Sequence, residues 1–233
     1  MRIPITKYGL PQVAVFPTIL IVLMAIALLL GKKFMPIWAT ITVEVILLIV
    51  LAWAISFFRD PFRATTADKN LLIAPADGKV TDIEIVDEPE FIQGKALRIG
   101  IFLSIFNVHI NRAPCDCTIK KITYKKGKFK NALDPESARV NESNDIYLTR
   151  SQSPQDKLIV RQISGAIARH IVCKTAPGKK LTAGQQFGMI KFGSRTELYI
   201  PQSDYTQCMV KIGDKVNAGL TPMVKYNSTQ QVQ

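Results

Sequence analysis

The sequence predicts a mainly β domain preceded by an N-terminal α-helical membrane hairpin. Three observations support this fold class. Two long apolar runs fill residues 1–58, short runs with β character begin at Leu71, and one glycine-bounded segment occurs twice. A chain of 233 residues suits one compact domain with an attachment, or two small domains. The mean hydropathy of +0.15 is high for a soluble protein, and the excess lies in the first apolar runs.

The first apolar runs are candidate membrane helices. Residues 13–30 carry no charge, and residues 37–57 carry only Glu44. At about 1.5 Å per residue, such helices come close to spanning a bilayer core of roughly 30 Å. The segment GKKFMP between them indicates a turn, so we expect a hairpin over residues 1–58. A signal peptide is the alternative for the first run, but no small-x-small cleavage site precedes the second run.

The distribution of charge predicts how this hairpin is oriented. Cytoplasmic segments next to membrane helices are enriched in Lys and Arg. Five basic residues flank the outer ends of the hairpin and two lie in its turn: Arg2, Lys7, Arg59, Arg63 and Lys69, against Lys32 and Lys33. We therefore expect both termini, and the following domain, on the cytoplasmic side of the cell membrane. A hairpin that enters the bilayer without crossing it is the alternative.

The composition also indicates the kind of partner. The formal net charge is +12, of which +9 belongs to residues 59–233. Beside a membrane anchor, this charge favours an anionic lipid surface over nucleic acid, although the lysines could also form ordinary solvated faces. There are two histidines and no C-x-x-C pair, so we expect no metal site and reduced, packing cysteines. The cysteines are Cys115, Cys117, Cys173 and Cys208.

Residues 59–70 are predicted to be an interfacial linker and residues 71–233 to be the β domain. The stretch FFRDPFR has the aromatic and arginine residues typical of a membrane exit, and Pro61 ends the helix. Apolar residues then alternate with a period of two within residues 97–103, which indicates a strand. Residues 164–172 fit a short helix or a buried strand equally well.

The repeated segment comprises residues 178–184 and 213–219, which share the pattern G-x-x-[LV]-x-A-G. Each copy indicates a glycine turn, a strand residue and a second turn. Such hairpins resemble the repeats of biotinyl- and lipoyl-type folds. We therefore predict a small barrel-sandwich-like β domain with two related halves, and Ser194 falls between the two copies.

Three stretches could form a catalytic site. The sequence contains no G-x-S-x-G, H-E-x-x-H, Walker or G-x-G-x-x-G motif, so an α/β-hydrolase or a nucleotide enzyme has no support. A site would need a histidine, an acid and a nucleophile. Asp77 in PADGKV, His109 in NVHINRAP and Ser194 in FGSR supply these groups. Taken singly, each is also an ordinary turn or core residue.

Taken together, these stretches resemble the short form of phosphatidylserine decarboxylase over nearly the whole chain. The resemblance rests on the hairpin and on separated motifs that occur in the family's order. These motifs are FFRDPFR, PADGKV, FLSIFNVHINRAP, YKKGKF, RQISGAIARHIVC and AGQQFGMIKFGSRTELYIP.

The resemblance implies a precursor that cuts itself between Gly193 and Ser194. Ser194 would become a covalently bound pyruvoyl group, and no metal would be needed. Fragments 1–193 and 194–233 would remain together as a heterodimer.

The family's catalytic triad maps onto Asp77, His109 and Ser194. The histidine would take the serine proton, and the aspartate would orient the imidazole. The implied reaction converts phosphatidylserine, an anionic phospholipid of the membrane, to phosphatidylethanolamine, with the pyruvoyl carbonyl as electron sink. The alternatives are an archaetidylserine decarboxylase acting on ether lipids, an unprocessed membrane serine hydrolase, and an inactive lipid-binding relative.

The sequence departs from the family at four places. Ser143 follows Asn-Glu where arginine is usual, and Cys117 replaces a glycine after RAP-x-D. Phe106 stands where long-form relatives carry a second histidine, so no proton donor for decarboxylation is assigned. His170, where arginine is frequent, is interpreted as structural. The residues that bind the substrate phosphate stay unassigned.

Overall fold

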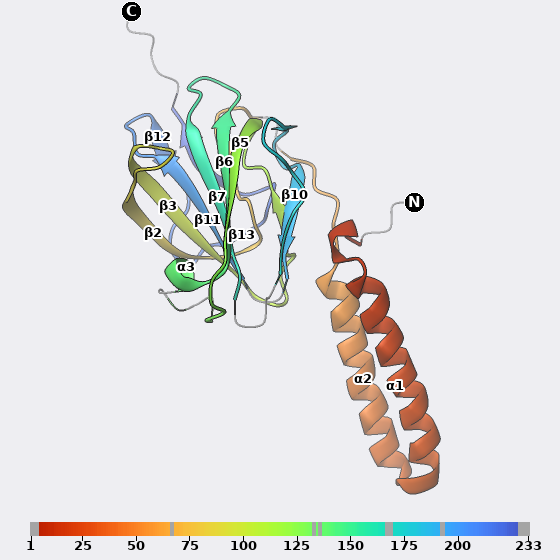
Figure 1. Ribbon diagram of the computed structural model, residues 1–233. Coiled ribbons are helices and arrows are strands. Elements are labelled where there is room, and N and C mark those ends of the chain that lie inside the picture. Colours follow the sequence, from red (N-terminus) through yellow and green to blue (C-terminus); the bar gives the residue numbers. More distant parts are fainter. Residues whose placement is uncertain are drawn as a thin grey trace, which may run out of the picture. The chain divides into compact units, whose positions relative to one another are not determined.

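The computed structural model describes residues 5–65, 68–131, 134, 137–165, 170–191 and 194–227. The chain divides into two compact units, Met1–Phe62 and Arg63–Gln233. The first unit is helical and the second is built of β-strands (Figure 1).

Two long helices form the first unit. They are α1 (Gln12–Phe34) and α2 (Ile37–Phe57), and a short 3₁₀ helix, η1 (Lys7–Gly9), precedes them. Both helices are long and apolar enough to cross a membrane. The predicted pair of apolar helices is thus confirmed.

The connection between the two helices is shorter than predicted. Lys32 and Lys33 lie in the last turn of α1, where cations interact favourably with the helix dipole, and not in the turn itself. Met35 is extended because it precedes Pro36, and this conformation ends the helix.

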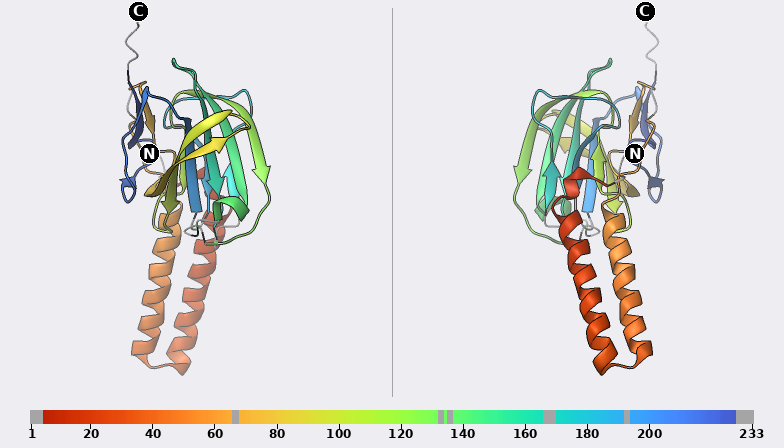
Figure 2. Two further views of the ribbon diagram at one scale, coloured as in Figure 1. Left: turned by 90° about the vertical axis from the view of Figure 1, so that its left-hand side faces the viewer. Right: turned by 90° about the vertical axis from the view of Figure 1, so that its right-hand side faces the viewer.

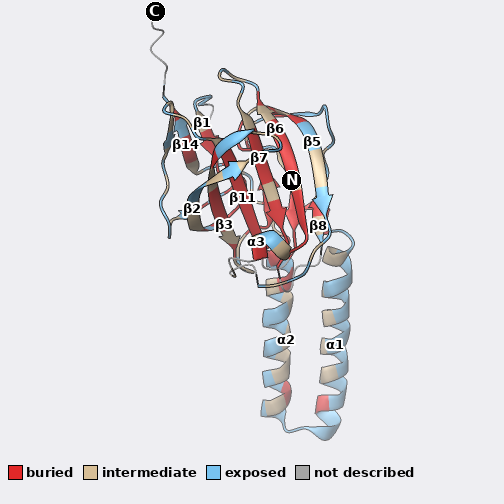
Figure 3. Ribbon diagram, turned by 60° about the vertical axis from the view of Figure 1, so that its left-hand side comes forward, coloured by how far each residue is buried: buried red, intermediate tan, exposed pale blue. Residues whose placement is uncertain are grey.

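The helices of the first unit approach each other closely at Gly31. A Cβ atom on Gly31 would collide with the side chain of Thr40, so the missing side chain allows the contact. Most other helix positions are exposed (Figure 3). Apolar helices with such exposed surfaces are expected where lipid is the solvent.

The second unit contains three sheets. One has eight strands in the order β13-β2-β3-β11-β7-β6-β5-β9, and the others have the orders β1-β14-β12 and β4-β10-β8. The strands up to β7 are β1 (Leu71–Ile73), β2 (Gly78–Glu88), β3 (Gly94–Leu103), β4 (Ile110–Arg112), β5 (Cys117–Lys125), β6 (Ser143–Arg150) and β7 (Lys157–Ile163), with the short helix α3 (Ser137–Val140) between β5 and β6. The others are β8 (Ile171–Cys173), β9 (Lys180–Leu181), β10 (Gln186–Ile190), β11 (Ser194–Pro201), β12 (Thr206–Cys208), β13 (Lys215–Val216) and β14 (Pro222–Tyr226).

The two glycine repeats form the two edges of the eight-stranded sheet. In each copy a two-residue strand, β9 or β13, lies between two glycines with positive φ, of 84° and 74° in the first copy and 99° and 77° in the second. The sheet curls (Figure 2), and the loops after its edge strands meet, since a Cβ on Gly219 would lie 3.5 Å from Gly184 Cα. The predicted mainly β fold with its internal hairpin repeat is therefore confirmed.

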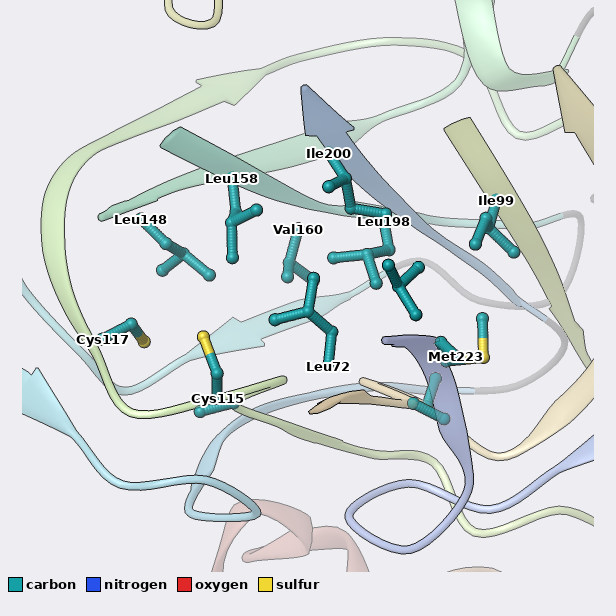
Figure 4. Packing of buried hydrophobic residues seen from close by; sticks show 14 of the residues in the cluster. Leu72, Ile99, Cys115, Cys117, Leu148, Leu158, Val160, Leu198, Ile200 and Met223 are labelled. Carbon is teal, nitrogen blue, oxygen red and sulfur yellow. The ribbon is translucent and has the colours of Figure 1, made fainter. Parts of the chain in front are cut away.

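The hydrophobic core lies on the inner face of this curled sheet (Figure 4). Leu198 and Ile200 of β11 are fully buried there, and Tyr199 between them points to the opposite face. Cys115 and Cys117 also pack in the core, and all four cysteines are free. For residues 164–172 we expected either a short helix or a buried strand. Residues 171–172 belong to strand β8, whereas residues 166–169 lie outside the described residues.

Candidate active site

Ser194 is the first residue of β11, where it pairs with Leu103 at the end of β3. Its side chain is fully buried, and its Oγ has no hydrogen-bond partner within the described part of the chain. Leaving a buried polar group unpaired costs about 1–3 kcal/mol, so such a group requires an explanation. Gly193, the other half of the predicted cleavage site, lies outside the described residues.

His109 follows a tight turn that reverses the chain after β3. The amide of Asn107 donates to the carbonyl of Ser104 at 2.8 Å, and the amide of Ser104 donates to Asn107 Oδ1 at 2.9 Å. His109 is fully buried, and its Nδ1 lies 2.9 Å from the carbonyl oxygen of Asn107. Because a carbonyl can only accept, Nδ1 carries the proton and Nε2 is the basic nitrogen.

Two hydrogen bonds join the segments that carry His109 and Ser194. Asn111 Nδ2 donates to Thr196 Oγ1 at 3.1 Å, which joins β4 to β11. His109 and Ser194 each lie two residues before the partners in this bond. The amide of Ile190, four residues before Ser194, donates to the His109 carbonyl at 3.2 Å.

Asp77 lies in the loop before β2 and is almost completely buried. Arg63 binds both of its carboxylate oxygens, Nη1 to Oδ1 at 2.5 Å and Nη2 to Oδ2 at 2.7 Å. The amide of Ala218 also donates to Oδ1, at 2.8 Å. Within the described residues, none of the Asp77 hydrogen bonds reaches His109. The tautomer of the imidazole, whose control we expected from Asp77, is set here by the carbonyl of Asn107.

Asp77 nevertheless lies at the same end of the sheet as Ser194. Lys79, Phe102 and Arg195 form one row across β2, β3 and β11. Asp77 lies two residues before Lys79 along the chain, and Ser194 lies one residue before Arg195. Strand β3 separates them, so two inter-strand spacings, or roughly 10 Å, lie between their backbones.

A chain of buried amides supports the histidine strand. Gln162 Nε2 donates to Asn111 Oδ1 at 2.8 Å, and Asn144 Nδ2 donates to Gln162 Oε1 at 3.0 Å. Together with Thr196, these side chains are buried and link β6, β7, β4 and β11. None of these four residues was predicted as a site residue from the sequence. The available signal was the presence of polar side chains at inward positions of otherwise apolar strands.

Arg195 anchors the start of β11 from the opposite face of the sheet. Its guanidinium crosses β3 above Gly100, where a Cβ would collide with it, and donates to Asp82 Oδ1 at 2.7 Å and Glu197 Oε1 at 2.9 Å. Burial alone would lower the pKa of Arg195, but the charge of Glu197 and the hydrogen bond and charge of Asp82 outweigh it and raise the pKa. Arg195 therefore stays charged, and it ties the strand that begins at Ser194 to β2.

The structure also describes the surroundings of the places at which the sequence departs from the family, beginning with the two residues before Ser143. Asn141 Nδ2 donates to the carbonyl of Ser164 at 2.8 Å, and Glu142 Oε1 accepts from the hydroxyl of Tyr124 at 2.7 Å. Phe106 and His170 are exposed. In the part of the chain that the structure describes, no group of three or more His, Cys, Asp or Glu residues could hold a metal ion.

Comparison with known proteins identifies the relatives of this chain. The sequence profile of the phosphatidylserine decarboxylase family matches residues 50–223. A phosphatidylserine decarboxylase proenzyme of Desulfotalea psychrophila is 44% identical over 176 residues, which cover 76% of this chain and 80% of that protein. Proteins of the same name are 39% identical in Rhodopirellula baltica, covering 96% and 89%, and 35% identical in Magnetococcus marinus, covering 94% of each chain.

The family profile and these relatives define the class of the protein as a decarboxylase, a lyase, whose relatives are named as proenzymes. Both the profile match and the relatives cover most of the chain. The chain belongs to the phosphatidylserine decarboxylase family. Its two apolar N-terminal helices are compatible with association with a membrane.

Proposed function

We propose that this chain is a phosphatidylserine decarboxylase proenzyme that cuts itself between Gly193 and Ser194 and then uses a pyruvoyl group derived from Ser194. Asp77, His109 and Ser194 are the proposed site residues. One observation supports the proposal most strongly. The buried Oγ of Ser194 has no partner among the described residues, and the strand that Ser194 begins is hydrogen-bonded to the strand that follows His109, whose basic nitrogen is Nε2.

The first step transfers an acyl group within the chain. His109 Nε2 accepts the hydroxyl proton of Ser194, and Oγ attacks the carbonyl carbon of Gly193. The new C–O bond forms as the Gly193–Ser194 C–N bond breaks, and the released nitrogen takes up the proton. A glycine suits this position because it has no Cβ to oppose a strained backbone.

The second step releases the N-terminal fragment. A base removes the Cα proton of residue 194, and the Cβ–O bond breaks. Gly193 leaves as the terminal carboxylate of fragment 1–193, and residue 194 is left as dehydroalanine. Addition of water to its tautomer releases ammonia and gives the pyruvoyl group at the head of fragment 194–233.

The surroundings of residue 194 fit a pyruvoyl group. The group is no larger than the serine that it replaces, and Ser194 Oγ makes no hydrogen bond in the described structure that a carbonyl would lose. Pairing of β11 with β3 and β7 would hold it in place. When present, the group supplies an electrophilic carbonyl and an electron sink for loss of carbon dioxide from a serine head group. His109 Nε2 is a nitrogen that can hold or deliver a proton nearby.

The membrane helices suit a substrate that stays in the bilayer. We propose residues 1–58 as the membrane hairpin, residues 59–70 as the linker and residues 71–233 as the catalytic domain, on the cytoplasmic side. Tethering raises the concentration of the domain at the lipid surface. The net charge of +9 on residues 59–233 favours contact with anionic head groups.

The mass of the purified protein tests this proposal. We expect two chains, residues 1–193 and 194–233, the smaller without a free amine at its N-terminus. Ser194→Ala should leave a single chain, and His109→Ala should slow cleavage by about 10²–10⁴-fold, as for the loss of a general base. Ser203→Ala, in a surface turn, is the matched control and should split normally.

Carbonyl chemistry separates turnover from processing. The cleaved enzyme should lose activity with hydroxylamine and resist serine-directed acylating reagents, because residue 194 is no longer a serine. Borohydride added with phosphatidylserine should attach lipid to fragment 194–233 alone. A Ser194→Ala chain that still splits after Gly193 would point to a separate protease instead.

A further inference from the structure

The loop that carries Asp77 has a counterpart elsewhere in the chain. The sequence Ala-Pro-x-Asp occurs at residues 74–77 and again at residues 113–116. Each copy leads directly into a strand, β2 or β5, and each of these strands pairs with one glycine repeat, β13 or β9. The two halves of the domain therefore share a loop as well as a hairpin.

The backbone around the two aspartates matches closely. Ala218 donates its amide hydrogen to Asp77 Oδ1 at 2.8 Å, and Ala183 donates its amide hydrogen to Asp116 Oδ1 at 2.8 Å. Ala218 and Ala183 occupy the same position of the two glycine repeats. In both halves the following glycine donates to the carbonyl of the loop alanine, at 2.9 Å.

The halves differ in what binds the rest of the carboxylate. Asp116 Oδ2 accepts from the neutral amide of Gln152 at 3.0 Å. Asp77 instead forms a bidentate ion pair with Arg63, and the two side chains are only 6–7% exposed. Among the described residues Asp116 has no cationic partner, so this loop can hold its carboxylate with neutral donors alone. The need for Arg63 therefore arises from the site and not from the loop.

We propose that Arg63 is a positioning residue for Asp77 during self-processing, an inference that rests on the proposed function. The guanidinium fixes the plane of the carboxylate with two parallel hydrogen bonds, a geometry that lysine cannot reproduce. Arg63 Nη1 also donates to the carbonyl of Ala218 at 2.6 Å. It thus fixes Asp77 against the part of the chain that becomes fragment 194–233.

The rate of cleavage after synthesis in vitro, with membrane vesicles present, tests this role. We expect Arg63→Gln to slow cleavage by about 10- to 100-fold, the range found when a residue that orients a metal ligand is lost. Arg63→Lys should be intermediate, because it keeps the charge but not the fork. Gln152→Ala, the matched change beside Asp116, should cleave at the wild-type rate.

A double-mutant cycle distinguishes positioning from general stability. If Arg63 acts through Asp77, Arg63→Gln should have no further effect on the rate in an Asp77→Asn chain. Additive slowing, or a slowing matched by Gln152→Ala, would overturn the proposal, as would wild-type cleavage by Arg63→Gln. Melting of each variant in the uncleavable Ser194→Ala background reports folding separately. If the wild-type chain does not split at all, the proposed function has failed, whereas wild-type cleavage with an indifferent Arg63 rejects only this inference.

Discussion

Thr196 is the residue through which the strand carrying Ser194 contacts the strand that follows His109. Its Oγ1 accepts from Asn111 Nδ2, and both side chains are fully buried. Thr196→Val keeps the shape but leaves that amide hydrogen without an acceptor, so we expect a loss of about 1–3 kcal/mol of unfolding free energy. Cleavage should also slow, because the lost bond holds β4, the strand that directly follows His109. Denaturant unfolding of a chain that carries both Thr196→Val and Ser194→Ala, compared with Ser194→Ala alone, measures the loss of unfolding free energy.

Thr118→Val is the control for this experiment. Thr118 is half-buried in β5, and its side chain makes no hydrogen bond within the described residues. Equal destabilisation by the two changes would show that the Asn111–Thr196 bond contributes nothing specific.

The ionisation of Asp82 predicts a dependence of stability on pH. Burial alone would raise its pKa, but hydrogen bonds from Arg195 and Thr81 and the charges of Arg195 and Arg98 lower it overall. A lowered pKa in the folded state stabilises the protein above the unfolded value, about 3.9, and this contribution is lost as the pH falls through the folded value. As the pH decreases below about 4, the unfolding free energy of Asp82→Asn should therefore fall less steeply than that of the wild type.

Asp87→Asn, at an exposed position of the same strand, is the control for the exchange of aspartate for asparagine, and it should leave the unfolding free energy at neutral pH unchanged. Parallel curves for the wild type and Asp82→Asn would show that the ion pair with Arg195 does not contribute to stability in acid.

At the scale of elements, strand β11 depends on a glycine in its neighbour. Gly100 of β3 has no side chain, and the guanidinium of Arg195 occupies that space. Gly100→Ala should displace Arg195 from Asp82 and lower the unfolding free energy by about 1–3 kcal/mol, as for other cases of overpacking. Gly94→Ala, in the same strand but with open space around it, should be neutral or slightly stabilising. Urea unfolding of both variants makes the comparison, and equal effects would contradict the role given to Arg195.

The helices and strands were more predictable from the sequence than the side-chain contacts that join them. The apolar helices, the glycine turns and the mainly β character follow from local composition and period, and the structure confirms them. The bond between Asn111 and Thr196 joins residues 85 positions apart, and it depends on the register of two strands that no local pattern specifies. The ion pair of Arg63 escaped prediction for a further reason. We assigned Arg63 to the membrane exit by composition, whereas its side chain is buried against Asp77.

At the scale of the whole molecule, the orientation of the chain in the membrane can be tested. Five basic residues flank the outer ends of the predicted hairpin, so we expect the C-terminus in the cytoplasm. A C-terminal reporter should be active only inside the cell. Lys33→Cys should react with an impermeant reagent from outside if the hairpin crosses the bilayer, and should be protected if it only enters it. Labelling of the C-terminus from outside intact cells would overturn this orientation.

The place of β11 within the eight-stranded sheet has a consequence for the cut protein. Fragment 194–233 would supply an interior strand, β11, between β3 and β7, an edge strand, β13, beside β2, and β14 beside β1. Such a piece encloses no core of its own, so it could form only while the rest of the chain folds around it. The mature enzyme would then consist of two fragments that folded together as one chain before the cleavage separated them. Its halves could not be exchanged between molecules, and mixing separately made fragments should not restore what a single act of folding produces.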